Sequence, residues 1–193
     1  MNSDLLEMLY NNRAILEGHF LLTSGRHSDK YIEKFRVLED PKSLTLICSK
    51  MANSYKNKNI DIVLGAAIGG IVISAGVGRI LNVKHIFTER VDNIMSLRRG
   101  FILPEGSRVL IVEDIVTTGG SIRELIEIVE EKGGEIIGIQ SILDRNENPV
   151  NFGYIYQPLL QFPVKSWNID DCPDWLLKIP VTKPGSSGRT KNI

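Results

Sequence analysis

The chain has no excess of charge of either sign and no long apolar run. Lys and Arg total 23, as do Asp and Glu, so the formal net charge is zero. This balance argues against a general nucleic-acid or membrane-surface binder, because such proteins rely on surplus basic side chains. No apolar run approaches the length of a membrane span, and the first residues lack the basic and apolar regions of a signal peptide. We therefore expect a cytoplasmic protein whose partners include neither nucleic acid nor membrane.

Cysteine is scarce. The two that occur, Cys48 and Cys172, are far apart and show no metal-ligand spacing. We expect reduced thiols, with neither a disulfide nor a metal role. The chain also lacks internal repeats and any linker that would divide it. Its 193 residues therefore predict one domain over residues 1–185 and a short C-terminal tail over 186–193.

Apolar segments typical of buried strands alternate with segments of helical periodicity. Strands are expected at 60–64, 83–88, 109–112 and 136–143. Helices are expected at 4–12, from Pro41 to about 53, from about 70 to 81, and from Ser121 onward. This alternation predicts an α/β fold in which a parallel sheet is flanked by helices.

The most specific pattern lies between Arg108 and Ser121. Val109–Val112 is an unbroken apolar run, which is typical of a strand buried on both faces. Two carboxylates, Glu113 and Asp114, follow it, and we expect both at the solvent-facing carboxyl end of the strand. The turn that comes next is small and rich in hydroxyl groups, and it consists of Thr117, Thr118, Gly119, Gly120 and Ser121.

A turn of this composition is suited to binding an anion. Paired glycines let successive N–H groups point at one ligand, and a helix start adds free N–H groups and a positive dipole end. Ser121 is the expected N-cap of that helix, and Glu124 completes a capping box. Carboxylates beside an anion site fit a ligand that carries hydroxyls or magnesium as well as phosphate, such as a phosphorylated sugar. The alternative is an ordinary strand-to-helix turn with solvated acidic residues. The pattern matches neither a P-loop nor a dinucleotide fingerprint.

The segment 109–121 resembles the phosphoribosyl-pyrophosphate (PRPP) motif of the type I phosphoribosyltransferases. The resemblance implies that family's fold, and it implies Mg²⁺ held through PRPP and water rather than directly by side chains. The glycine-rich turn at 65–70 corresponds to the turn that wraps the pyrophosphate, without the lysine that some members carry there. The motif residues assigned to PRPP are Glu113, Asp114, Ile115, Val116, Thr117, Thr118, Gly119, Gly120 and Ser121.

A second pattern, near the N-terminus, is similar to the opening signature of the orotate phosphoribosyltransferases. In that family the segment forms a small hood over the base, which implies a hood from about residues 1–40 here. On composition alone the segment is an ordinary hairpin. Thr23 stands where many members have a lysine. The matching residues are Phe20, Leu22, Ser24, Gly25, Ser28 and Tyr31.

Asp144 and Arg145 follow the predicted strand at 136–143. An arginine after a strand is usually just solvated. Here it stands where open α/β sheets bind ligands, and its planar fork suits carboxylate or carbonyl oxygens. Orotate-specific relatives place an Asp-Arg pair at this point. The resemblance therefore assigns four residues to orotate: Ser24, Gly25, Thr117 and Arg145.

The segment 89–101 joins two predicted strands and contains three arginines. On composition it is a solvated loop or a surface hairpin. The resemblance implies a mobile loop, 90–100, that closes over the partner subunit's site in a homodimer, with Ile94 where the loop usually has a lysine. The residues assigned to PRPP from this loop are Arg90, Arg98 and Arg99. The residues assigned to catalysis are Glu113, Asp114 and Arg90.

The resemblance implies transfer of the phosphoribosyl group from PRPP to orotate, giving orotidine 5′-monophosphate and pyrophosphate in de novo pyrimidine (UMP) biosynthesis. Three alternatives stay open. They are a phosphoribosyltransferase for another base, a non-enzymatic regulator that binds PRPP, and a member that turns over slowly because of Ile94. The balanced charge and the lack of a basic tract disfavour a regulator that binds nucleic acid.

Overall fold

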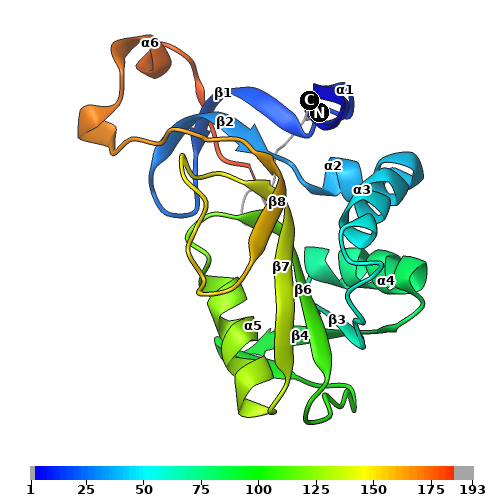
Figure 1. Ribbon diagram of the computed structural model, residues 1–193. Helices are drawn as coiled ribbons and strands as arrows, with labels where there is room; N and C mark the ends of the chain where they lie inside the picture. The colour runs from blue at the N-terminus through cyan, green and yellow to red at the C-terminus, as the bar shows by residue number, and fades with distance from the viewer. Residues whose placement is uncertain (1–2, 185–193) are drawn as a thin grey trace.

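The structure, a computed structural model, describes residues 3–184 (Figure 1). The predicted tail, 186–193, lies outside the described residues. In chain order the elements are α1 (Ser3–Asn11), β1 (Ile15–Leu21), β2 (His27–Ile32), α2 (Phe35–Leu38), α3 (Pro41–Asn53), β3 (Ile62–Ala66), α4 (Gly69–Leu81), β4 (Lys84–Val91), β5 (Ile94–Leu97), β6 (Arg108–Val116), α5 (Gly120–Glu131), β7 (Glu135–Asp144), β8 (Tyr156–Gln161), the 3-10 helix η1 (Ile169–Asp171), α6 (Asp174–Leu177) and β9 (Val181–Thr182).

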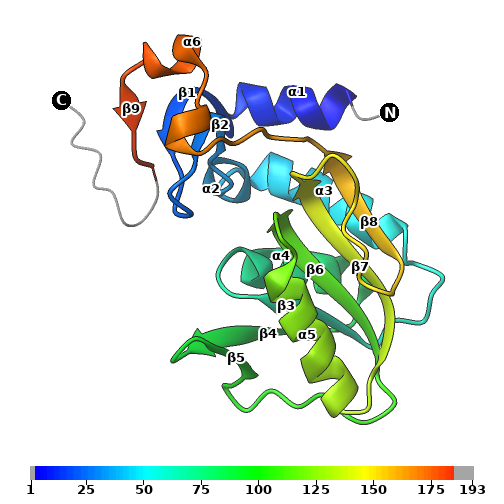
Figure 2. The ribbon, with the colours of Figure 1, turned by 90° about the vertical axis from the view of Figure 1, so that its left-hand side faces the viewer.

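The central sheet has six strands in the order β5-β4-β3-β6-β7-β8, all labelled in Figure 2. β5 runs antiparallel to β4, and the other neighbouring strands are parallel. Helices α3 and α4 pack on one face and α5 packs on the other. The predicted α/β fold with a parallel sheet flanked by helices is therefore confirmed.

Side chains along β6 alternate between two separate cores. Val109 and Ile111 belong to the core beneath α5, whereas Leu110 and Val112 belong to the core shared with α3 and α4. All four are completely buried. Because side chains of a strand point to opposite faces in turn, the next two residues of β6, which are the carboxylates, must also point to opposite faces.

A second sheet, with strand order β2-β1-β9, forms the hood. β1 and β2 make an antiparallel hairpin, and β9 from the C-terminal region pairs in parallel with β1. Figure 2 shows this sheet and α6 together, beyond the carboxyl ends of β6 and β7. The hood was predicted from about residues 1–40 only. Sequence patterns did not reveal the C-terminal contribution, because β9 has just two residues.

Two local features bear on the predictions. The helix predicted from Pro41 is confirmed, since the side chain of Asp40 caps α3 by accepting a hydrogen bond from the Ser43 N–H at 2.8 Å. The segment 89–101 is largely a hairpin, because β4 extends to Val91 and pairs with β5. Within residues 3–184, no helix combines the length and the apolar character needed to cross a membrane.

Candidate active site

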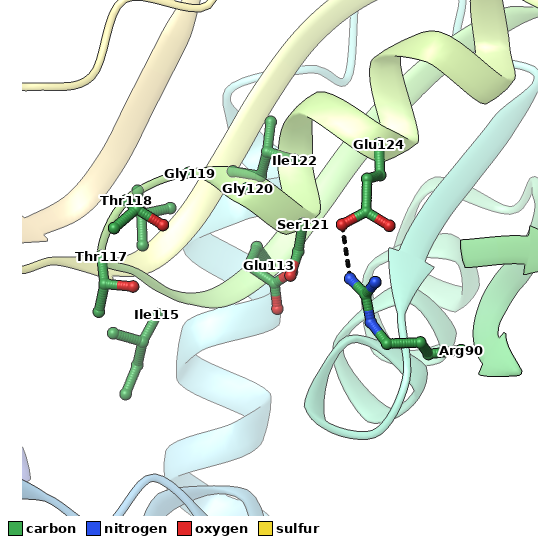
Figure 3. Close-up of a pocket in the computed structure, with 11 residues that line it drawn as sticks. Arg90, Glu113, Ile115, Thr117, Thr118, Gly119, Gly120, Ser121, Ile122 and Glu124 are labelled. Carbon is green, nitrogen blue, oxygen red and sulfur yellow. Dashed lines mark hydrogen bonds and ion pairs between the residues drawn. The ribbon is translucent and has the colours of Figure 1, made fainter. Parts of the chain in front are cut away.

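The predicted anion-binding turn lies between β6 and α5 (Figure 3). Gly119 precedes α5 with a φ of +79°, and a Cβ there would lie 2.7 Å from the ring of Phe152. The prediction of Ser121 as N-cap is wrong, because α5 begins at Gly120 and Gly119 is the cap residue. Glycine occupies this position because it adopts a positive φ without strain. Among the described residues no side chain caps α5, so its first N–H groups can bind an anion.

A cavity of about 230 Å³ opens over this turn. Glu113 and all the motif residues from Ile115 to Ser121 line it, with Arg90 and Glu124 on the other side (Figure 3). Small side chains and helix N–H groups thus surround a space that suits a phosphate-bearing ligand. Asp114, alone among the motif residues, does not line this cavity.

The two carboxylates point to opposite faces of the sheet, as the alternation along β6 requires. Glu113 faces the cavity beside α5, whereas Asp114 faces the turn before α4. A Cβ on Gly69 would lie 1.8 Å from Asp114 Oδ2, so only glycine fits there. The expectation of solvent-facing carboxylates is wrong, because Glu113 and Asp114 are 7% and 3% exposed.

Asp114 has a cationic partner that sequence patterns did not predict. Lys34 Nζ lies 2.5 Å from Asp114 Oδ2, and Asp114 Oδ1 accepts a hydrogen bond from the Ile115 N–H at 2.6 Å. Both carboxylate oxygens are therefore engaged. The one available signal was the place of Lys34, three residues after Tyr31 of the hood signature.

Glu113 holds a proton more tightly than an ordinary glutamate. Its Oε1 accepts a hydrogen bond from the Asp114 N–H at 3.0 Å. Burial, and secondly the negative charge of Asp114, raise the pKa of Glu113 to about 8. A ligand that binds the ionised Glu113 carboxylate therefore competes with a proton.

Arg90 is held at the edge of the cavity by an ion pair with Glu124. Its Nη2 lies 2.6 Å from Glu124 Oε1, and its Nη1 donates to the Asn93 carbonyl at 2.7 Å (Figure 3). The capping-box role predicted for Glu124 is wrong, since this side chain binds Arg90 instead. Arg90 is thus brought to the predicted site.

The other two loop arginines are not brought to this cavity. Arg99 Nε and Nη2 lie 2.8 and 2.9 Å from the carboxylate of Glu89. Neither Arg98 nor Arg99 lines the cavity at the PRPP motif within the described structure. That Arg98 and Arg99 contact PRPP therefore stays a prediction.

A second cavity, of about 540 Å³, adjoins the first. Thr117 and Thr118 line both cavities. Ser24 from the hood and Arg145 from the end of β7 also line the second one. The structure thus brings together three of the predicted orotate residues, whereas Gly25 lies in the adjoining hood turn and does not line the cavity.

Arg145 offers a donor that has no partner in the described structure. Its Nε is buried and unpaired, and burial lowers the pKa of the guanidinium while Tyr31 acts in the opposite direction. A buried donor without a partner is unfavourable unless a ligand supplies one. The second cavity is therefore suited to a planar, anionic ligand.

Asp144 positions a neighbour instead of pairing with Arg145. Its Oδ1 accepts hydrogen bonds from the backbone and side-chain N–H groups of Asn146, at 2.9 and 2.7 Å. Asn146 Nδ2 also donates to the Thr117 carbonyl at 2.6 Å and lines the second cavity. Sequence reasoning assigned no role to Asn146, which holds the backbone of Thr117, a residue that lines both cavities.

Comparison with known proteins agrees with this geometry. The sequence matches the phosphoribosyl transferase domain family over residues 36–156. An orotate phosphoribosyltransferase from Caldicellulosiruptor bescii is 46% identical over 187 residues, which cover 96% of this chain and 98% of that protein. One from Thermotoga maritima is 39% identical over 182 residues, which cover 94% of this chain and 97% of that protein.

A solved structure extends the likeness to the fold. The orotate phosphoribosyltransferase of Aeropyrum pernix superposes with a TM-score of 0.71 at 25% identity, covering 81% of this chain and 93% of that one. The resemblance that the PRPP motif and the hood signature indicated is confirmed. The chain belongs to the phosphoribosyl transferase domain family and, within it, to the orotate phosphoribosyltransferases.

Proposed function

We propose that this protein is an orotate phosphoribosyltransferase in activity, converting PRPP and orotate into orotidine 5′-monophosphate and pyrophosphate in de novo pyrimidine biosynthesis. One observation carries the proposal. An anion-binding turn and a cavity with an unpaired buried arginine nitrogen adjoin at Thr117 and Thr118. Two such cavities suit a phosphorylated sugar and an anionic base that react at their boundary.

PRPP would lie over the motif turn. The backbone N–H groups and hydroxyls from Thr117 to Ser121 would hold its 5′-phosphate, since they line the cavity at a free helix start. Glu113 would accept hydrogen bonds from the ribose hydroxyls. Asp114 would support this strand end from the opposite face, where Lys34 and Gly69 fix it.

The Glu113 carboxylate also suits the bound Mg²⁺ that we propose for this reaction. Mg²⁺ prefers oxygen ligands and usually keeps several waters while contacting substrate phosphates. Glu113 lines the cavity, so its carboxylate could accept a hydrogen bond from a metal-bound water. When bound, Mg²⁺ would neutralise the charge of the pyrophosphate leaving group.

Orotate would lie in the second cavity. Arg145 would donate to its carboxylate or carbonyl oxygens, and Ser24 and Thr117 would fix the ring. A ring nitrogen of orotate then bonds to the sugar carbon as the bond to pyrophosphate breaks. Positive charge develops on the sugar during this step, and the carboxylate of Glu113, which lines this cavity, would stabilise that charge.

Arg90 would contact the pyrophosphate once the anion competes with Glu124 for the guanidinium. We propose that the protein is a cytoplasmic homodimer, in which the 90–100 hairpin reaches the partner's site. The edge position of β5, and the absence of Arg98 and Arg99 from the described lining of the PRPP cavity, support this arrangement. Both cysteines, Cys48 and Cys172, are buried free thiols, in keeping with a reducing compartment.

The test follows orotate by its ultraviolet absorbance in the presence of PRPP and Mg²⁺, with a reaction lacking Mg²⁺ as control. Magnesium-dependent loss of orotate is expected, together with formation of pyrophosphate. A panel containing adenine, hypoxanthine and uracil completes the assay. Loss of another base with orotate untouched would contradict the proposed substrate, and PRPP binding without any turnover would contradict the proposed activity.

A further inference from the structure

Three side chains from distant parts of the chain meet in the hood, away from the two cavities. His19 of β1, His27 of β2 and Cys172 after η1 each offer one ligand atom, and these atoms all lie within 4.8 Å of one another. The three residues are 4%, 9% and 8% exposed. Figure 2 shows that the C-terminal turn carrying α6 lies beside β1. The cluster therefore joins the hairpin to the C-terminal segment.

The protonation of His19 can be read from its partners. His19 Nδ1 lies 2.9 Å from the carbonyl oxygen of Ile179. A carbonyl oxygen only accepts hydrogen bonds, so Nδ1 carries a proton, and in the neutral ring Nε2 is then the nitrogen with the lone pair that a metal needs. Nε2 faces His27 Nδ1 at 2.6 Å. A histidine oriented in this way by a backbone carbonyl is the usual arrangement of a metal ligand.

The backbone holds both histidines in place. The pairing of β1 with β2 shifts register between Glu17 and Phe20, and such a bulge re-aims the side chains within it, here including His19. His27 exchanges two backbone hydrogen bonds of 2.8 Å with Trp167, which precedes the Cys172 turn. The cluster is thus pre-organised by pairings on both sides.

We propose that His19 Nε2, His27 Nδ1 and Cys172 Sγ bind one Zn²⁺ ion, with a water molecule as the fourth ligand. Zinc takes imidazole nitrogen at about 2.0–2.1 Å and thiolate sulfur at about 2.3 Å in tetrahedral geometry, which places ligand atoms about 3.5 Å apart. The observed separations, from 2.6 Å to at most 4.8 Å, bracket that value. Small side-chain rotations satisfy it. On binding, the Cys172 thiol releases its proton to solvent, and His27 carries its proton on Nε2.

The ligand chemistry selects among metals. The set contains nitrogen and sulfur and no carboxylate, which excludes a dedicated Mg²⁺ or Ca²⁺ site. The site is therefore distinct from the proposed Mg²⁺ at the PRPP motif. Sequence spacing predicted no metal role for Cys172, because its two partners come from the opposite end of the chain.

The position of the cluster indicates a structural role. Arg26, the neighbour of His27, lines the second cavity, where we propose that orotate binds. Its Nε and Nη2 donate hydrogen bonds to Ser166 of the C-terminal segment. Ser28 on the other side donates to the Lys165 carbonyl at 2.7 Å. A zinc ion at the cluster would hold the hairpin and the C-terminal segment together, and so would hold one wall of the second cavity in place.

The test titrates Zn²⁺, and Co²⁺ as its coloured substitute, into the chelator-treated full chain. Excess Mg²⁺ is present to occupy the carboxylates of the PRPP motif. We expect one ion per chain and, with Co²⁺, a near-ultraviolet thiolate-to-metal charge-transfer band. Cys172→Ser should abolish that band, and His27→Gln should weaken Zn²⁺ binding by at least about 100-fold, since even a residue that only orients a ligand contributes about 10- to 100-fold.

The chain supplies matched controls, because it has just one other cysteine and one other histidine. Cys48→Ser and His85→Gln should leave the stoichiometry and the band unchanged. Zn²⁺ should raise the melting temperature of the wild type and of both controls, but not of the Cys172 variant. If Cys172→Ser does not fold, the charge-transfer band of Cys48→Ser decides whether Cys172 binds the metal, because Cys172 is the sole thiol of that variant.

Two results would overturn the proposal. One is the absence of a charge-transfer band in the wild type, which would leave a hydrogen-bonded histidine pair only. The other is equal Zn²⁺ affinity of the wild type and His27→Gln, which would place the metal elsewhere.

Discussion

Lys34 Nζ and Asp114 Oδ2, 2.5 Å apart, connect the hood to the strand of the PRPP motif. Lys34 follows β2, whereas Asp114 belongs to β6. The Asp114 side chain is 4% exposed and that of Lys34 is 34% exposed, so little water is available to replace the ammonium group. The hood thus supplies the cation that balances the buried Asp114 carboxylate of the motif.

Replacing Lys34 with methionine should destabilise the fold. The change leaves the Asp114 carboxylate buried without its cation, and breaking such a pair costs about 3–5 kcal/mol when both partners are enclosed. Because Lys34 is one-third exposed, we expect a loss of about 2 kcal/mol in the free energy of unfolding, measured by urea denaturation at neutral pH.

Lys30→Met is the matched control for this variant. Lys30 pairs with Glu17 at 3.0 Å, but the Glu17 side chain is 63% exposed. An exposed pair contributes less than about 1 kcal/mol. Equal losses in the two variants would show that water, and not Lys34, stabilises Asp114.

Glu113 should make stability depend on pH. Its pKa is raised from the ordinary 4.5 to about 8 by burial and by Asp114. Below both values the folded and unfolded states are equally protonated. As pH rises through this window, the unfolded chain ionises first, so the contribution to stability falls. Glu113→Gln, which cannot ionise, should lose less stability than the wild type between about pH 5 and 8. Parallel pH profiles in denaturation would contradict the raised pKa.

Ionisation of Glu113 should also shape activity. If the Glu113 carboxylate holds the ribose hydroxyls, kcat/KM for PRPP should fall as pH drops through about 8, which is the pKa of Glu113 in the protein without ligand. Glu113→Gln should lower kcat by about 100-fold, as expected for lost electrostatic stabilisation. Asp114→Asn should shift this fall in kcat/KM to lower pH, because the Asp114 charge raises the pKa of Glu113. Lys34→Met should shift it to higher pH, because the Lys34 charge lowers that pKa. Shifts in the same direction would refute the assignment.

The sequence predicted the motif well because its signal is local. A buried run, two carboxylates and a glycine turn determine a strand, a turn and a helix start within fourteen consecutive positions, Arg108 to Ser121. The same run also contained a signal that was not used. Residues buried on both faces must alternate, so Glu113 and Asp114 had to point apart rather than share one ligand face.

Non-local partners were beyond sequence reasoning. Lys34 reaches Asp114, and Arg90 reaches Glu124, only after the chain has folded. β9 joins the hood through two residues that carry no strand pattern of their own. A single sequence shows which residue types are available at a strand end, but packing decides which of them meet.

Arg145 should discriminate orotate from bases without a carboxylate. A hydrogen bond to a charged group contributes about 1.5–3 kcal/mol. Arg145→Gln should therefore raise KM for orotate by about 10- to 100-fold, while any use of uracil, which lacks the carboxylate, should change little. Arg108→Gln is the control, since Arg108 pairs with Glu135 at the start of β7, the end of that strand opposite to Arg145. Equal losses for both bases would mean that Arg145 supports the cavity wall without contacting the base.

Gly119→Ala should separate backbone strain from loss of the anion site. Gly119 and Gly106 have similar φ angles, +79° and +74°, but only at Gly119 would a Cβ meet a neighbour, Phe152. Gly106→Ala should lose about 1 kcal/mol of stability, the usual strain of a left-handed alanine, and should bind PRPP as the wild type does. Gly119→Ala must also move Phe152 or the turn, so its N–H groups lose their alignment. We expect its Kd for PRPP, measured by calorimetry, to rise at least about tenfold, the effect of losing about one charge-assisted hydrogen bond. Unchanged affinity in a folded Gly119→Ala protein would mean that side chains, rather than the backbone of this turn, hold the phosphate.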